Sequence, residues 1–184
     1  LLFLLVLLLP ATAIWRDGGW VARKDSRAVV IEIAKVVSAF TLAHSLTLGL
    51  AAFGWISLPS RWVEVAIAAS VLVAAFNNLQ PFVRGTPWML ALGFGLIHGL
   101  GFATLLGILS LPFGAKGIAL LAFNLGVELG QLAIVAGCLP VLLWLRHSKY
   151  YRRALIELPS LLIAWIAALW VVERTTGYRL FSLD

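Results

Sequence analysis

PWMLALGFGLIHGLGFATLLGILSL, residues 87–111, is an apolar stretch without a single Asp, Glu, Lys or Arg. A helix needs roughly 20 consecutive apolar residues to cross the hydrocarbon core of a bilayer, so this stretch predicts a transmembrane helix. The whole 184-residue chain has the same character, because 62% of it is hydrophobic and only 12% is charged. In soluble domains, about 45–50% of the residues are apolar and about 25% are charged. This composition excludes an ordinary soluble domain, a disordered chain and a disulfide-stapled scaffold, and it predicts an all-α, polytopic transmembrane helical bundle.

Apolar runs on both sides of this stretch predict about six spans in a single transmembrane domain covering residues 1–184. The first run is too short to cross a bilayer, and no basic segment precedes it as in a signal peptide. We therefore expect it to be the end of a helix that begins upstream. The predicted spans are residues 1–14, 28–53, 62–79, 87–111, 117–145 and 154–172.

The distribution of Lys and Arg predicts the orientation of the bundle. Nine of the 14 basic residues lie on the side of the loops 15–27, 80–86 and 146–153, and four lie on the other side. The positive-inside rule places the first side in the cytoplasm, which leaves the C-terminus in the periplasm of a bacterial inner membrane. Because the basic residues are spread over these loops, the net charge of +6 does not indicate nucleic-acid binding.

The second predicted span carries the motif FTLAHSLTL, residues 40–48. Helical spacing places Thr41, His44 and Ser45 on one face. A neutral imidazole offers a lone pair to a metal or a site for a proton. Hydrogen bonding between helices explains the same residues equally well.

The third predicted span carries polar residues at both ends and in its middle. Glu64 lies close to the outer interface, where it either contributes to a site or simply faces headgroups or pairs with Arg61. Ser70 lies seven residues before Asn77 and on the same face, and Asn78 follows directly.

The fourth predicted span places His98 near the midplane, within FGLIHGLGFA, residues 94–103. An ionisable residue at this depth is costly and is a candidate functional group by default. Gly95 and Gly99 form a G-x-x-x-G pair, which predicts close packing against another helix backbone. The close packing explains the glycines but not His98.

The fifth predicted span carries FNLGVELGQ, residues 123–131. Asn124, Glu128 and Gln131 follow i, i+4, i+7 spacing, so an amide, a carboxylate and a second amide share one face. A carboxylate this deep must be protonated, paired or bound to a cation. Gly126 and Gly130 form a second small-residue pair on a neighbouring face.

Two imidazoles and a carboxylate at similar depth predict a divalent metal site with His44, His98 and Glu128 as ligands. Imidazole with oxygen ligands suits nickel, cobalt, zinc or copper, and ligand type alone does not choose among them. No catalytic residue is assigned, because the chain has no G-x-S-x-G, P-loop, H-E-x-x-H or C-x-x-C motif. The supporting polar residues are Thr41, Ser45, Glu64, Ser70, Asn77, Asn78, Asn124 and Gln131.

The four motifs, in this order and spacing, resemble the HupE/UreJ family of bacterial membrane proteins, in its second branch. The resemblance covers residues 1–140. It implies a nickel or cobalt permease or a metal-supply accessory, associated with hydrogenase and urease maturation. It also implies site roles for the His44–Ser45 pair, the His98–Gly99 pair and Glu128. Two departures stand out: the family's G-x-D-H segment would precede Leu1, and Asn77 stands where members often have Glu.

Two other functions remain open at this point. In an intramembrane metal-dependent hydrolase, the expected upstream Asp-His pair with His44, His98 and Ser45 would hold a metal and activate water, and Glu128 would be the general base. In an accessory structural subunit of a larger membrane complex, the polar groups would join helices or ligate a pigment or haem. The expected partners are the lipid bilayer, a metal ion, and other membrane subunits or metalloenzyme maturation proteins, with no nucleic acid.

Overall fold

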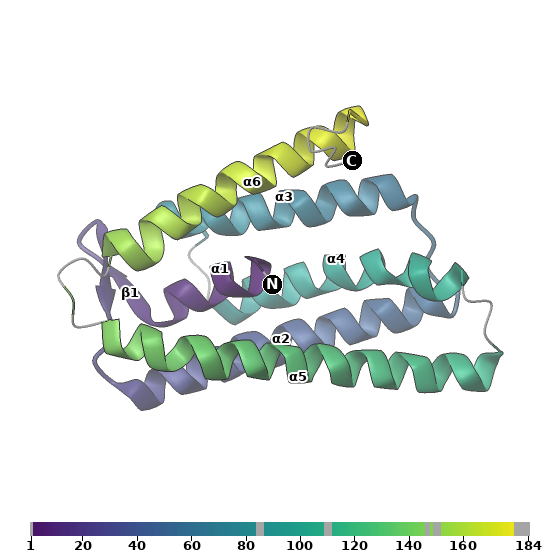
Figure 1. Cartoon of the computed structure of the whole chain (residues 1–184), viewed down its shortest axis with the longest axis horizontal. Helices are drawn as coiled ribbons and strands as arrows, with labels where there is room; N and C mark the ends of the chain where they lie inside the picture. The colour runs from purple at the N-terminus through teal and green to yellow at the C-terminus, as the bar shows by residue number, and fades with distance from the viewer. Residues whose placement is uncertain (1, 84–86, 109–111, 146–147, 149–151, 179–184) are drawn as a thin grey trace.

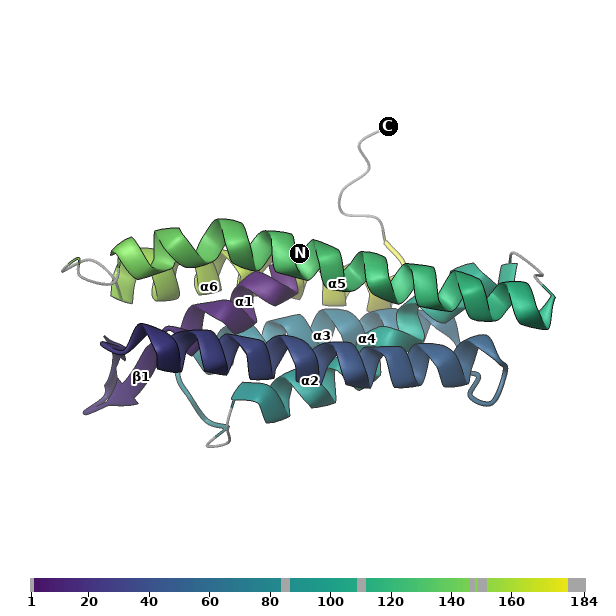
Figure 2. The same cartoon turned by 90° about the horizontal axis from the view of Figure 1, so that it is seen from below.

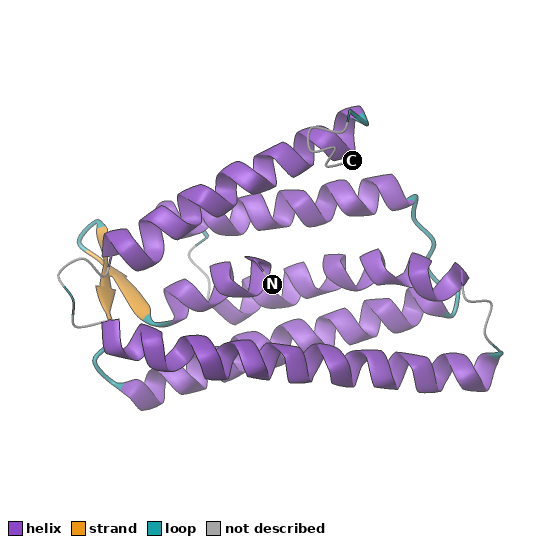
Figure 3. Ribbon diagram, viewed as in Figure 1, coloured by secondary structure: helices purple, strands orange, loops and turns teal. Residues whose placement is uncertain are grey.

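The chain folds into helices that run roughly along one common axis, with a small β-hairpin across one end (Figure 1). This computed structural model describes residues 2–83, 87–108, 112–145, 148 and 152–178. Figure 3 shows that the described chain is helical apart from the hairpin and the connecting loops. The elements are α1 (Leu2–Ala11), β1 (Ala13–Arg16), β2 (Gly19–Ala22), α2 (Ser26–Ala52), α3 (Ser60–Leu79), α4 (Pro87–Ile108), α5 (Phe113–Leu145), the π-helix η1 (Arg152–Glu157) and α6 (Leu158–Thr176).

The all-α helical bundle predicted from composition is confirmed. Within the described residues, four helical segments are long and apolar enough to cross a membrane, namely Ser26–Ala52, Ser60–Leu79, Phe113–Leu145 and Leu155–Thr176. Helix α4 contains no Asp, Glu, Lys or Arg, and the last residues of its predicted span, 109–111, lie outside the described residues. The chain leaves α1, α3 and α5 at the hairpin end of the bundle and enters α2, α4 and α6 there (Figure 1). The described parts of the three loops predicted to share one side therefore lie at one end.

The first predicted span, residues 1–14, is wrong at its C-terminal end. Helix α1 ends at Ala11, and the chain then forms an antiparallel hairpin in which Trp15 pairs with Trp20. The turn residues Asp17 and Gly18 have φ angles of 48° and 77°. Asp-Gly is a preferred pair for a two-residue hairpin turn, because that turn needs positive φ at both positions. The indole N–H of Trp20 donates to the Asn78 carbonyl at 2.5 Å, which ties the hairpin to α3.

Helix α1 lies inside the bundle, with α5 and α6 on one side and α2, α3 and α4 on the other (Figure 2). Its Phe3, Val6 and Leu7 belong to the largest buried apolar cluster, together with residues of α2, α3, α4 and α6. Leu4 and Leu8 belong to a second cluster, shared with α2 and α5. Between helices in a bilayer, such contacts stabilise the packing through van der Waals attraction, because the surrounding lipid is as apolar as the side chains.

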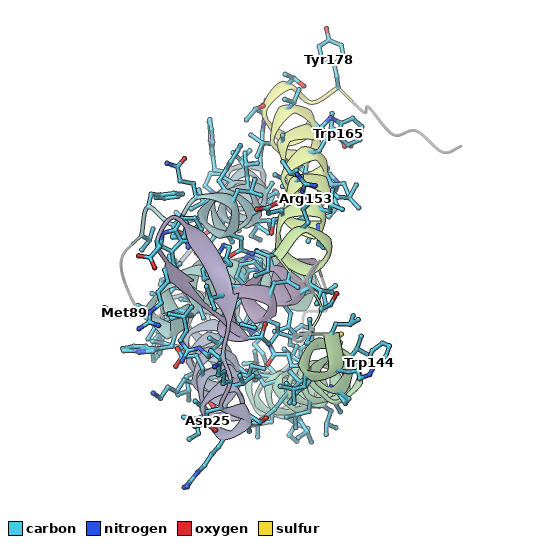
Figure 4. The ribbon with its side chains drawn as sticks, turned by 90° about the vertical axis from the view of Figure 1, so that its left-hand side faces the viewer. Asp25, Met89, Trp144, Arg153, Trp165 and Tyr178 are labelled. Carbon is cyan, nitrogen blue, oxygen red and sulfur yellow. The ribbon has the colours of Figure 1, made fainter. Side chains whose placement is uncertain are left out.

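The outward surface of the bundle is strongly apolar. Trp144 on α5 and Trp165 on α6 are 77% and 63% exposed and point away from the bundle (Figure 4). On α2, Leu42 is 72% exposed, and on α5, Leu121 is 74% exposed. Soluble monomers rarely leave so many large apolar side chains in water. A hydrocarbon solvent around the helices accounts for this surface.

Candidate intramembrane metal site

The imidazole of His44 is enclosed by aromatic rings. The side chain projects from α2 and is only 2% exposed. Its ring centroid lies 5.7 Å from that of Phe40, 6.0 Å from Phe102 and 6.2 Å from Phe123. Its Nδ1 atom is buried and has no hydrogen-bond partner of normal geometry among the described residues, and the Asn124 side chain is the polar group next to the ring. A buried polar atom without a partner is costly, so this nitrogen marks a position where a bound ion or water would be stabilised.

The second imidazole, that of His98, is held by a hydroxyl. Ser70 on α3 places its Oγ atom 3.0 Å from His98 Nε2. The same hydroxyl donates to the Ile67 carbonyl at 2.7 Å. A serine hydroxyl has one proton to donate, so in this pair the neutral imidazole is the donor. The proton is thereby assigned to Nε2, and Nδ1 keeps its lone pair. The centroid of the His98 ring lies 4.4 Å from the centroid of the Phe3 ring.

Close packing of α2 against α4 holds the two imidazoles at the same level. A Cβ atom at Gly95 would lie 2.6 Å from the Phe40 carbonyl oxygen. A Cβ atom at Gly99 would overlap the His44 carbonyl oxygen and the Thr47 hydroxyl. The close packing predicted for the G-x-x-x-G pair is therefore present. It brings the Phe40 ring centroid to 5.6 Å from that of His98 on α4, while His44 lies one turn along α2 from Phe40, with ring centroids 5.7 Å apart.

Two side-chain hydrogen bonds join α2 to α5 on either side of His44. Thr41 donates to Gln131 Oε1 at 2.8 Å, and Ser45 donates to Asn124 Oδ1 at 2.8 Å. The Asn124 amide group in turn donates to the Leu120 carbonyl at 3.0 Å. The polar face predicted on α2 thus meets the polar face predicted on α5, and the four side chains supply oxygen atoms next to the imidazole.

Glu128 shares the depth of His44 but not its burial. It lies on α5 between Asn124 and Gln131, whose partners on α2 bracket His44. Its side chain is exposed. The carboxylate therefore lies at the level of His44 but on an exposed part of α5.

The chain matches a known protein family over nearly its whole length. Residues 1–174 match the family model described as HupE / UreJ protein. The chain belongs to the HupE/UreJ family. No curated protein and no solved structure gives a significant match. The resemblance found from the four motifs is thereby confirmed.

In this HupE/UreJ protein, Asn77 and Asn78 lie toward the hairpin end rather than beside the imidazoles. They follow Ser70 by seven and eight residues, which is about 10–12 Å along a helix. Asn77 Oδ1 accepts the backbone N–H of Val83 at 3.0 Å. Asn78 donates to the Val6 carbonyl at 2.7 Å and to the Ser160 hydroxyl at 3.3 Å. These amides join α3 to α1, α6 and the following loop.

Glu64 lies near the other end of α3. Its carboxylate is 2.7 Å from Arg174 Nε of α6, and both side chains are about half exposed, at 50% and 42%. The guanidinium of Arg61 instead donates to the carbonyls of Arg174, at 3.1 Å, and of Thr175. The predicted alternative pairing of Glu64 with Arg61 is therefore replaced by pairing with α6.

The structure thus divides the predicted site residues among several places. Ser70 joins His98, and the four hydroxyl and amide residues of α2 and α5 surround His44. Glu128 reaches the same level from an exposed flank. Within the described ranges, no group of three His, Cys, Asp or Glu side chains is gathered closely enough to hold a metal ion together.

Sequence reasoning missed the aromatic lining of the site. Phe40 lies four residues before His44 on the same helix. Side chains four apart on a helix are neighbours, so this spacing was a usable signal for ring contacts. The contribution of Phe3 had no such signal, because it comes from a different helix.

Proposed function

We propose that this HupE/UreJ protein is a permease for a divalent transition-metal cation, of the nickel or cobalt type, in the bacterial inner membrane. The observation that carries the proposal is His44 Nδ1, a buried nitrogen without a hydrogen-bond partner among the described residues. A second imidazole, that of His98, lies at the same level across one phenyl ring. Neutral imidazole nitrogens are preferred ligands of nickel, cobalt, zinc and copper.

The arrangement suits a cation that passes through rather than one that stays. A conducted ion must bind well enough to enter and weakly enough to leave. Two separate imidazoles, with hydroxyl and amide oxygens of Ser45 and Asn124 nearby, would hold the ion with few protein ligands at a time. Water would complete its coordination.

Glu128 supplies the charge in this account. A divalent cation near the midplane is costly without a compensating negative group. The Glu128 carboxylate lies at the depth of His44, on an exposed part of α5. We assign it the role of stabilising the cation electrostatically as the cation moves between the helices.

The test is metal flux into proteoliposomes that hold a nickel-sensitive dye. We expect saturable nickel entry with the wild-type chain, and at least a tenfold loss in His44→Ala and in His98→Ala. His147→Ala is the matched control, since it changes the third histidine, which lies in the predicted loop 146–153 and outside the described residues. Equal entry with all four proteins would contradict the proposal, as would an absence of saturable entry with the wild type.

A further inference from the structure

A cavity of about 480 Å³ lies beneath the hairpin, where the hairpin meets α1, α3 and the start of α4. Its volume is within the range of small-molecule sites, about 300–1,000 Å³. Most of its wall is apolar, and the polar part is contributed by the hairpin and the end of α3. The residues that carry the argument are Trp15, Trp20, Arg23, Asn77 and Asn78.

The wall of this cavity is held in place by hydrogen bonds that cross between elements. Trp20 is tied to the Asn78 carbonyl, and the Asn78 amide is tied to α1 and α6. Asn77 uses its carbonyl oxygen to accept from Val83, so its amide group provides donors at the cavity wall. A cavity with such a fixed wall is largely formed before a ligand arrives.

The charge of the wall selects the kind of ligand. Arg23 is the charged residue among the described lining residues, and none of them is Asp or Glu. Its Nε atom donates to the Ala13 carbonyl at 3.3 Å, which holds the side chain along the hairpin. A guanidinium has five N–H donors in a planar fork that matches phosphate oxygens. A bare metal cation is therefore disfavoured here, and an anion with several oxygens is favoured.

The position of the cavity indicates that its ligand also has an apolar part. Two indoles, Trp15 and Trp20, pack edge to face at 5.4 Å beside it, and tryptophan is enriched at the headgroup level of membranes. Basic pockets between transmembrane helices on the cytoplasmic side suit anionic lipid heads. The apolar wall of the cavity would contact the carbon atoms that adjoin the anionic headgroup of the ligand.

We propose that this cavity binds a phosphate ester, with Arg23 and the Asn77 amide on the phosphate oxygens and the apolar wall on the adjoining carbon atoms. Both a phospholipid head and a soluble phosphate ester have this chemistry. The proposal is independent of the metal site, which lies about two helical turns away along α3.

The experiment measures binding of defined probes to the full chain in detergent by native mass spectrometry. The probes are short-chain phosphatidylglycerol, glycerol phosphate and inorganic phosphate. Arg23→Gln removes the cavity cation, and Lys24→Gln is the matched control, since Lys24 is exposed and does not line the cavity. Leu90→Trp fills the cavity without changing charge, and it tests the proposal even if the Arg23 variant folds poorly.

We expect the dissociation constant of a phosphate probe to rise roughly tenfold in Arg23→Gln, which corresponds to about 1.4 kcal/mol. Lys24→Gln should bind as the wild type does, and Leu90→Trp should lose binding. Binding of phosphatidylglycerol alone identifies a lipid head as the ligand, and equal binding of glycerol phosphate identifies a soluble ester. Equal affinity in Arg23→Gln and the wild type, or no saturable binding of any probe, overturns the proposal.

Discussion

Replacement of Gly99 by alanine should disrupt the packing that holds the two imidazoles together. The added Cβ atom would meet the His44 carbonyl oxygen and the Thr47 hydroxyl, and it would lie 2.9 Å from the Leu48 backbone nitrogen. Two of these three atoms belong to the backbone of α2, which cannot move aside as a flexible side chain can. Helices α2 and α4 must therefore separate at the level of His44.

The magnitude follows from a comparison with Gly93→Ala on the same helix. A Cβ atom at Gly93 would meet nothing within 4 Å. Both variants gain the same helix propensity of about 1 kcal/mol from glycine to alanine, so this gain cancels in the difference. Overpacking costs about 1–3 kcal/mol. We expect Gly99→Ala to be less stable than Gly93→Ala by about that amount.

The assay is reversible unfolding of both variants in mixed micelles by titration with a denaturing detergent. Nickel binding should fall in Gly99→Ala, because His44 is displaced, and should persist in Gly93→Ala. Equal stability and equal nickel binding in the two variants would refute the packing described for α2 and α4.

Three further changes test contacts elsewhere in the bundle. Trp20→Phe removes the hydrogen bond to the Asn78 carbonyl, so the hairpin should lose about 0.5–1.5 kcal/mol and exchange its amide hydrogens faster; unchanged exchange would contradict this contact. Glu64→Gln should change the free energy of unfolding by less than about 1 kcal/mol, because exposed ion pairs contribute little, and a loss of nickel binding would show that this carboxylate belongs to the site. Thr41→Val leaves Gln131 Oε1 without its donor, which should cost about 1–3 kcal/mol in detergent unfolding, whereas a variant as stable as the wild type would argue against this hydrogen bond.

The helices and their polar faces could be predicted from the sequence because both depend on local patterns. Apolar runs mark the helices, and i, i+3, i+4 spacing marks the residues that share a face. The G-x-x-x-G pair of Gly95 and Gly99 marked a close contact for the same reason. The pattern could not name α2 as the partner, since the order of helices around a bundle depends on packing between distant segments.

Because packing between distant segments has no local pattern, the sequence could not predict that the site residues would lie in several separate places. Glu64 pairs with Arg174, which is 110 residues later in the chain, and no local pattern indicates that pair. The hairpin, in contrast, had a local signal in Asp17–Gly18, flanked by Trp15 and Trp20. It was missed because the short apolar run before it was assigned to the first span as far as Ile14.

The most direct test of the central claim is elemental analysis of the purified wild-type chain beside a His44→Ala/His98→Ala double variant, both after exposure to nickel and cobalt. The account predicts nearly stoichiometric metal in the wild type and its loss in the double variant, with the helical circular-dichroism spectrum unchanged. A wild-type chain that retains no transition metal, beside an equally well folded double variant, would contradict the account.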